Sequence, residues 1–177
     1  MVVDLITGFL GAGKTTFIRA YAKYFMNKGS RICILENDYG AVNVDVMFLQ
    51  DLIGDQCELE MVIGGDGYEA HRRRFKTKLI SMAMMGYDRV LIEPSGVFDT
   101  DEFFDVLREE PLDRWYVPGN VISIVSALQE LPLSADARYL LASQIANAGC
   151  VVLSRTQTVS EQEIRAHHLK LSELLRI

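Results

Sequence analysis

The segment Gly8-Phe9-Leu10-Gly11-Ala12-Gly13-Lys14-Thr15 decides the fold. It fits the pattern G-x-x-x-x-G-K-[ST] at every fixed position, and it follows an apolar run, residues 2–7, that predicts a buried strand. Glycines let the backbone turn tightly and aim its N–H groups at phosphate oxygens, and the helix expected over residues 16–27 points its positive end at the same anion. We therefore predict a loop that binds a nucleoside triphosphate. The residues expected to contact it are Gly11, Ala12, Gly13, Lys14, Thr15 and Thr16.

Apolar runs alternate with helix-period segments along the rest of the chain. Further strands are expected at residues 31–36, 58–63, 89–93, 117–125 and 150–153, and further helices at 69–85, 101–108, 135–146 and 160–175. Residues expected to cap these helices are Asp66 with Glu69, Thr100, and Ser160 with Glu163. Such alternation predicts an α/β fold: a three-layer P-loop NTPase fold with a mostly parallel sheet and helices on both faces. In such a sheet ligands bind beyond the carboxyl ends of the strands.

Acidic residues follow two of the predicted strands. Glu93 ends a short apolar strand, where a P-loop protein holds Mg²⁺; an ordinary solvated acid is the alternative. Glu36-Asn37-Asp38-Tyr39-Gly40 could hold Mg²⁺, orient the attacking water, or form an Asx-turn. Gly96, shortly after Glu93, can place a backbone N–H near the γ-phosphate. We predict Lys14, Asp38 and Glu93 as catalytic groups, and Thr15, Asp38 and Glu93 as Mg²⁺ ligands.

Composition excludes several classes of protein. The 177 residues are 49% hydrophobic and 24% charged, which predicts one globular domain, residues 1–177. The net charge of -6 argues against binding to nucleic acid or to an anionic membrane, and no apolar run approaches the roughly 18 residues needed to cross a bilayer. The three cysteines, Cys33, Cys57 and Cys150, are widely spaced, and no basic leader precedes the first apolar run. We therefore expect a cytoplasmic protein without a disulfide framework.

Taken together, four stretches resemble the CobW-type P-loop GTPases, relatives of the nickel-insertion GTPases of urease and hydrogenase maturation. The stretches are Gly8 to Thr16, Glu36-Asn37-Asp38-Tyr39-Gly40, Glu93-Pro94-Ser95-Gly96 and Gln144-Ile145-Ala146-Asn147-Ala148. The resemblance implies a GTPase that uses Mg²⁺ and couples its nucleotide state to delivery of a transition metal (zinc, cobalt or nickel) or of a metal cofactor, as in cobalamin biosynthesis. It also implies a client metalloprotein or cofactor-dependent enzyme, and a nucleotide-dependent dimer. Asp38 would belong to the first switch and Glu93 to the second.

Two segments depart from the family pattern. The guanine-reading loop of the family is usually Asn-Lys-x-Asp, whereas the matching residues here are Ser154-Arg155-Thr156-Gln157. We expect Ser154, Arg155 and Gln157 to contact the base, with the stem of Arg155 lying along it. An aspartate accepts two hydrogen bonds from guanine, and the neutral amide of Gln157 cannot copy its charge, so the choice between guanine and adenine stays open.

The second departure concerns the metal site. The family often carries Cys-x-Cys-Cys between the two switches, but residues 62–71 contain no cysteine. Asp66, Glu69 and His71 are possible ligands; we favour the alternative of a helix cap followed by a solvated histidine. The basic cluster His71-Arg72-Arg73-Arg74 could contact nucleotide or an acidic partner, or form a solvated face.

Two further functions remain open from the sequence. One is a nucleotide-binding interaction module that has lost hydrolysis or metal transfer, which the altered base loop and the missing cysteines favour. The other is a small-molecule P-loop kinase, against which stands the lack of an arginine-rich lid segment. Members of the family usually continue into a C-terminal domain, and this sequence ends at Ile177, so we expect the GTPase domain only.

Overall fold

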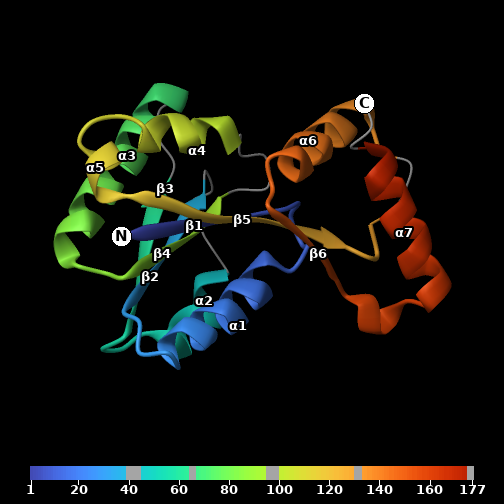
Figure 1. Cartoon of the computed structure of the whole chain (residues 1–177), viewed down its shortest axis with the longest axis horizontal. Coiled ribbons are helices and arrows are strands. Elements are labelled where there is room, and N and C mark those ends of the chain that lie inside the picture. The colour runs from blue at the N-terminus through green and yellow to red at the C-terminus, as the bar shows by residue number, and fades with distance from the viewer. Residues whose placement is uncertain (39–44, 64–66, 95–99, 130–132, 175–177) are drawn as a thin grey trace.

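The computed structural model describes residues 1–38, 45–63, 67–94, 100–129 and 133–174. Six parallel strands form one sheet in the order β3-β2-β4-β1-β5-β6 (Figure 1). The strands are β1 Val2–Thr7, β2 Ile32–Asp38, β3 Cys57–Ile63, β4 Arg89–Pro94, β5 Val117–Ser126 and β6 Cys150–Ser154. The predicted parallel α/β sheet is confirmed, and each predicted strand lies within three residues of its expected bounds.

Helices cover both faces of the sheet. In Figure 1, α1 and α2 lie below it, α3, α4 and α5 lie above it, and α6 and α7 lie beside β5 and β6. The helices are α1 Lys14–Met26, α2 Asp45–Leu49, α3 Tyr68–Met85, α4 Thr100–Leu107, α5 Leu112–Trp115, α6 Ala135–Ala146 and α7 Glu161–Leu174, with 3-10 turns η1 Gln50–Leu52 and η2 Thr156–Thr158. The sequence did not predict α2, α5 or the two turns, because three to five residues are too few to show a helical period.

Alternate residues of the inner strands pack into two separate hydrophobic cores, one on each face of the sheet. In β2, Cys33 and Leu35 pack in the core beneath α3 and α4, whereas Ile32 and Ile34 pack in the core against α1. All four side chains are fully buried. A strand covered on both faces has no solvent side, which explains why the strands read as continuous apolar runs in the sequence.

Strand order and register bring the predicted site together. The first strand lies between β4 and β5, so the loop after Thr7 emerges beside the end of β4. On the other side of β4, Glu36 of β2 stands opposite Glu93. The carboxyl ends of β1, β2 and β4 therefore meet at one edge, as the rule for ligand binding in parallel sheets requires.

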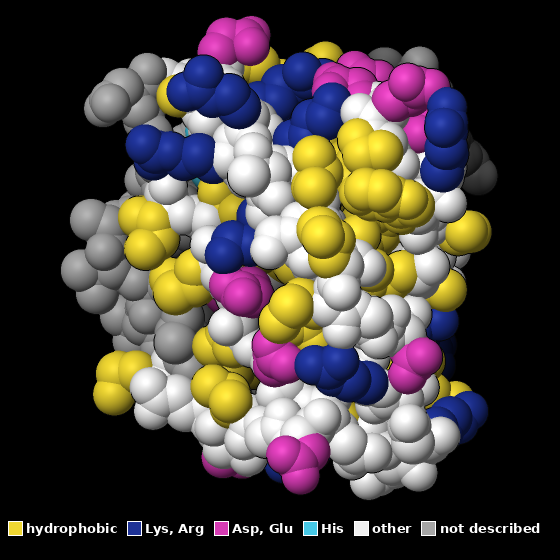
Figure 2. All heavy atoms as spheres, turned by 90° about the vertical axis from the view of Figure 1, so that its left-hand side faces the viewer, with side chains coloured by type: hydrophobic (Ala, Val, Ile, Leu, Met, Phe, Trp, Pro, Cys, Tyr) yellow, Lys and Arg dark blue, Asp and Glu magenta, His cyan; other side chains and the backbone are white. Residues whose placement is uncertain are grey.

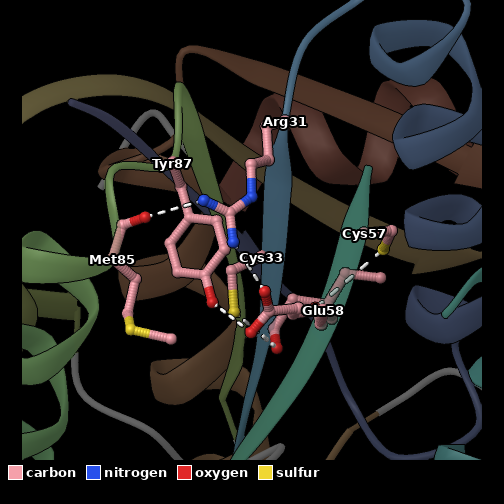
Figure 3. Close-up of polar contacts among 7 residues, drawn as sticks. Arg31, Cys33, Cys57, Glu58, Met85 and Tyr87 are labelled. Carbon is pink, nitrogen blue, oxygen red and sulfur yellow. Dashed lines mark hydrogen bonds and ion pairs between the residues drawn. The ribbon is translucent and has the colours of Figure 1, made fainter. Parts of the chain in front are cut away.

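A polar network ties the opposite ends of β2, β3 and β4 together (Figure 3). The Arg31 guanidinium donates to the Met85 carbonyl oxygen at 2.7 Å and to Glu58 Oε1 at 2.7 Å, and it lies 4.8 Å from the centre of the Tyr87 ring. The Tyr87 hydroxyl donates to the other oxygen of Glu58. Hydrogen bonds from Tyr87 and Arg31 lower the pKa of Glu58. These contacts link the turn between α3 and β4 to Arg31, which immediately precedes β2, and to Glu58 near the start of β3.

The three predicted helix caps have different outcomes. The capping box at α7 is confirmed, since Ser160 Oγ accepts from the Glu163 amide at 3.3 Å and the Glu163 carboxylate accepts from the Ser160 amide at 2.7 Å. The cap at Thr100 is wrong: Thr100 is the first residue of α4, and its hydroxyl accepts a hydrogen bond from the Asn147 side chain. Asp66 lies outside the described residues.

In the part of the chain that the structure describes, no helix is long and apolar enough to cross a membrane.

Candidate nucleotide site

Glycines shape the loop between β1 and α1. At Gly8, where φ is 142°, an added Cβ would stand 2.3 Å from the Ile124 carbonyl oxygen, so the chain passes β5 too closely for any side chain. Gly11 and Gly13 have φ of 73° and 95°, in the left-handed region that glycine adopts without strain. The loop therefore turns back over its own strand and delivers the chain into α1.

The amino end of α1 is left open for an anion. Gly13 occupies the cap position and supplies no side-chain hydrogen bond, and the first turn contains no acidic residue. In α6, by contrast, the Ser134 hydroxyl accepts from the Ala137 amide. Uncapped N–H groups at a helix start need a partner, and a phosphate provides one. The geometry fits the phosphate cradle predicted from the sequence.

Three predicted side chains converge at the cradle. Lys14 Nζ lies 3.7 Å from Glu93 Oε1, and the Thr15 hydroxyl donates to the same oxygen at 3.1 Å. Lys14 Nζ also donates to the Phe9 carbonyl oxygen at 3.4 Å. The side chains of Lys14 and Glu93 are only 7% and 5% exposed. A buried lysine and a buried carboxylate compensate each other's charge, and this pair joins the end of β4 to the start of α1.

The donor set suits magnesium. Thr15 and Glu93 offer a hydroxyl and a carboxylate oxygen at one point, and oxygen ligands of this kind are what Mg²⁺ takes in nucleotide sites. Glu36, in register with Glu93, is also almost fully buried. Asp38 ends β2, but its side chain lies outside the described part of the structure, as does Gly96. Their predicted roles therefore stay predictions.

A cavity of about 450 Å³ opens over the cradle. Its lining includes Gly11, Gly13, Lys14, Thr15, Thr16, Glu93 and Arg155, together with Leu10, Arg19 and Phe48. Sequence reasoning missed Arg19 and Phe48. A signal for Arg19 was available, because it stands four residues after Thr15 and so lies on the same side of α1.

Arg19 connects α1, the helix that follows the phosphate loop, to α2 and η1. Its guanidinium donates to both carboxylate oxygens of Asp51 and to the Phe48 carbonyl oxygen. These contacts of the Arg19 guanidinium, called the fork below, link α1 to α2 and η1. A planar guanidinium matches a carboxylate in two-point geometry, so the contact fixes orientation as well as distance.

The predicted base loop docks on the cradle through two of its three residues. Ser154 Oγ donates to the Ala12 carbonyl oxygen at 2.6 Å, and the Arg155 guanidinium donates to the Gly11 carbonyl oxygen at 2.6 Å. Arg155 adopts a left-handed conformation, with φ of 57°, and lines the cavity. Gln157 lies in η2, is exposed, and is not among the cavity residues. Ser154 and Arg155 thus tie the end of β6 to the phosphate loop.

The described residues provide no alternative metal centre. No group of three or more His, Cys, Asp or Glu side chains among them could hold a metal ion. His71 is fully buried, so the prediction of a solvated histidine is wrong; α3 packs that side chain inward. Glu69 is exposed and Asp66 lies outside the described residues. Burial raises the pKa of the Cys33 thiol and raises that of Cys57 to about 11, which disfavours the thiolates that soft metals need.

The fold and the cradle define a P-loop nucleotide-binding domain. The model of the family "CobW/HypB/UreG, nucleotide-binding domain" matches residues 2–176, and the chain belongs to this family. The predicted resemblance is therefore confirmed over almost the whole sequence.

Individual relatives agree with this assignment. The zinc chaperone YjiA of Escherichia coli is 28% identical, over 92% of this chain and 52% of its own length. The zinc-regulated GTPase metalloprotein activator 1 of Schizosaccharomyces pombe is 23% identical, over 99% of this chain and 44% of its own. The chain thus spans about half the length of these relatives.

Solved structures give the same picture. The Zn(II)-bound YjiA GTPase from Escherichia coli matches with a TM-score of 0.58 and 28% identity, over 96% of this chain and 54% of that one. The hydrogenase maturation factor HypB from Archaeoglobus fulgidus has a TM-score of 0.56 over 94% of this chain and 74% of its own, at 14% identity, which supports the fold alone.

Proposed function

We propose that this chain binds a nucleoside triphosphate, GTP first, with Mg²⁺ and hydrolyses it slowly, as a cytoplasmic switch in the delivery of a metal to a client protein. The observation that carries the proposal is the convergence of Lys14, Thr15 and Glu93 below an uncapped helix start. The family and the relatives named as GTPases support it.

Each cradle residue has a role in this proposal. The loop amides and the start of α1 hold phosphate oxygens, and Lys14 exchanges its contact with Glu93 for the β- and γ-phosphates. Thr15, Glu93 and Asp38 would hold Mg²⁺, which neutralises charge that develops on the transferred phosphoryl group. Asp38 or Glu93 would orient the attacking water.

The proposed rate is low because the arginines at the cavity are already engaged. Arg19 is held by Asp51 and the Phe48 carbonyl, and Arg155 is held by the Gly11 carbonyl. An arginine that is free to contact the γ-phosphate accelerates hydrolysis by about 10³ to 10⁵-fold in related GTPases. Within the described residues, neither cavity arginine is free in this way.

The proposed cargo is a divalent transition metal. Relatives are named as zinc chaperones, which favours zinc over cobalamin chemistry for this chain as well. A cargo site here would use oxygen and nitrogen ligands, since residues 62–71 lack cysteine. The nucleotide-dependent dimer stays a prediction.

A second function is favoured by one observation. The described residues contain no candidate metal cluster. On that observation, a nucleotide-binding interaction module that has lost metal transfer accounts for the chain as well as metal delivery does. Family membership argues against the third possibility, a small-molecule kinase.

Nucleotide competition combined with phosphate release tests the proposal. GTP, ATP and their diphosphates are titrated against the wild type and Lys14→Ala, each with Mg²⁺. We expect micromolar triphosphate binding and slow phosphate release, both lost in Lys14→Ala with an unchanged circular dichroism spectrum. Unchanged nucleotide affinity in Lys14→Ala would refute the cradle assignment.

Equilibrium dialysis with zinc, cobalt and nickel, in the GTP-bound and GDP-bound forms, separates the two candidate functions. A one-to-one metal site whose affinity depends on the nucleotide supports metal delivery. Nucleotide turnover without any such site supports the interaction module.

A further inference from the structure

We infer that Arg19 is a catalytic arginine for the proposed hydrolysis, and that Asp51 holds it in a resting position from which it is released to contact the γ-phosphate. This inference rests on the proposed function and adds two residues to it. Arg19 would touch the reacting phosphate, whereas Asp51 would act only through Arg19 as a positioning residue.

The first observation is the place of Arg19 at the nucleotide cavity. It lines this cavity of about 450 Å³ together with Lys14, Thr15 and Glu93. It follows Thr15 by four residues in α1, so its Cα lies on the same side of the helix, about 6 Å further along the axis. The Cα–Cβ bonds of a helix tilt towards its amino end, which here is the phosphate end. A released guanidinium can therefore reach back to where Lys14 is proposed to hold the γ-phosphate.

The second observation is that an acid outside the cavity holds this cation. Ion pairs are frequent on the molecule, and Figure 2 shows Lys and Arg side chains beside Asp and Glu side chains over one face. Two of the ion pairs between described residues include a residue that lines the cavity, namely Lys14 with Glu93 and Arg19 with Asp51. Glu93 lines the cavity itself, but Asp51 does not. Asp51 therefore draws a cation of the cavity towards η1.

The third observation is how much of the guanidinium the fork uses. Nη1 donates to Asp51 Oδ1 and to the Phe48 carbonyl oxygen, and Nη2 donates to Asp51 Oδ2 at 2.5 Å. A guanidinium has five N–H donors, so the fork uses three of them, including both on Nη1. The carboxylate also neutralises the charge of the guanidinium. In the fork, the two-point face of Arg19 is not available to a phosphate.

The reaction gives a released arginine a clear role. The oxygen of the attacking water bonds to the γ-phosphorus, the bond from that phosphorus to the bridging oxygen breaks, and the bonding electrons leave with the β-phosphate. The water proton is released with inorganic phosphate. Charge on the transferred group spreads over its three outer oxygens, and a planar guanidinium can bind two oxygens at once. Contact with Arg19 would stabilise this arrangement.

The fork is weak enough to open. The side chains of Arg19 and Asp51 are 36% and 53% exposed, and ion pairs as exposed as this one contribute little free energy. Opening the fork therefore reduces the rate by a modest factor, the inverse of the fraction of molecules in which Arg19 is free. Removal of the Asp51 charge should recover that factor and no more.

Arg155, the other arginine of the cavity, is held differently. Its guanidinium donates to the Gly11 carbonyl oxygen, and the adjacent Ser154 hydroxyl donates to the Ala12 carbonyl oxygen. Both contacts keep the end of β6 on the phosphate loop, so releasing Arg155 would undo that docking. Arg19 is held by residues outside the phosphate loop, and its release leaves the loop intact.

A double-variant cycle on Arg19 and Asp51 tests the inference by single-turnover phosphate release from GTP with Mg²⁺. Arg19→Gln should lower the rate at least tenfold, because it removes the group that contacts the γ-phosphate. Asp51→Asn should raise the rate about three- to tenfold, because a neutral amide holds the guanidinium less strongly. In the Arg19→Gln background, Asp51→Asn should change the rate less than 1.5-fold, since the arginine it releases is absent.

Asp55→Asn is the matched control, since it removes one exposed negative charge four residues beyond Asp51, and it should change the rate less than 1.5-fold. The affinity for GDP should change less than threefold in every variant, which together with circular dichroism confirms the fold. Binding of GDP with aluminium fluoride, a mimic of the transferred phosphoryl group, should follow the rates.

The outcomes separate this inference from the proposed function. Turnover in the wild type that Arg19→Gln leaves unchanged overturns the role of Arg19 and spares the proposed hydrolysis. An Asp51→Asn rate equal to that of the wild type overturns the resting position. A rise in Asp51→Asn that persists in the Arg19→Gln background also overturns it, because loosening of α2 and η1 would then be responsible. No turnover in either the wild type or Asp51→Asn overturns this inference and the proposed hydrolysis together.

Discussion

Glu93 links the end of β4 to the phosphate loop and the start of α1. Its carboxylate is 5% exposed, accepts a hydrogen bond from Thr15 and lies 3.7 Å from the Lys14 ammonium. A buried carboxylate needs such partners to remain charged. Any anion that draws Lys14 away therefore changes the surroundings of the Glu93 carboxylate at the end of β4.

The variant Glu93→Gln separates binding from hydrolysis. The amide keeps an acceptor for Thr15 but removes the charge opposite Lys14 and one proposed Mg²⁺ ligand. We expect phosphate release to fall at least 100-fold, a loss of about 3 kcal/mol of transition-state stabilisation, while triphosphate affinity changes less than tenfold. Single-turnover phosphate release and nucleotide titration measure the two effects. A normal rate in this variant would remove Glu93 from the mechanism.

We propose that Gln157 influences the choice of base, a role that stays a prediction because this side chain is exposed and does not line the cavity. Guanine presents two N–H donors, and a carboxylate accepts both with its full charge, which a neutral amide cannot do. The variant Gln157→Asp should raise the preference for GTP over ATP by about 10 to 100-fold. Competition between the two nucleotides measures the ratio, with Thr156→Asp as the control that adds the same charge one residue earlier. If both variants shift the ratio equally, charge near the loop and not base contact is responsible.

At the scale of elements, the fork from Arg19 to Asp51 joins α1 to α2 and η1. The two side chains are 36% and 53% exposed, so the ion pair adds little to global stability, but it links α2 and η1 to α1. Sequence patterns did not predict this contact. Helical periodicity shows which face of an element is apolar, but it does not show which distant carboxylate a surface arginine meets.

The variant Asp51→Asn should therefore act locally. We expect its free energy of unfolding to change by less than about 1 kcal/mol, because exposed ion pairs contribute little. Amide exchange in residues 45–52 should accelerate several-fold, as measured by hydrogen exchange with mass spectrometry. Glu161→Gln, which removes an exposed ion pair within α7, serves as the control and should leave that segment unchanged. Unchanged exchange in Asp51→Asn would show that packing of Leu49 and Leu52 holds α2 without the fork.

At the scale of the whole molecule, the sequence predicted the layers and the cradle but not how the strands are ordered. The cradle followed from one motif, and the strands followed from apolar runs that are buried on both faces. The order β3-β2-β4-β1-β5-β6 places strands side by side that are not consecutive in the chain, and such pairing depends on the packing of complete helices. For the same reason the burial of His71 was missed, since the residue follows a polar loop and only the packed core of α3 draws it inward.

Stability against acid is a property of the whole molecule, because the relevant carboxylates link distant elements. Hydrogen bonds from Lys76 and Arg72 lower the pKa of Glu109, and those from Tyr87 and Arg31 lower the pKa of Glu58. A carboxylate whose pKa is lower in the folded chain stabilises the fold above the unfolded pKa, ordinarily 4.5. That contribution is lost as the pH falls from about 5 through the lowered folded value.

The variant Glu109→Gln should show this loss directly. At pH 7 we expect it to unfold with about 1 kcal/mol less free energy than the wild type, because two partly buried ion pairs to α3 are gone. As the pH falls below 4.5, Glu109 becomes neutral in the wild type as well, so the difference between the two proteins should shrink towards zero. Urea denaturation at pH 7, 5, 4 and 3 measures it, and Asp105→Asn, at an exposed ion pair in α4, is the control. A difference that stays constant with pH would show that the side chain acts by packing and not by its charge.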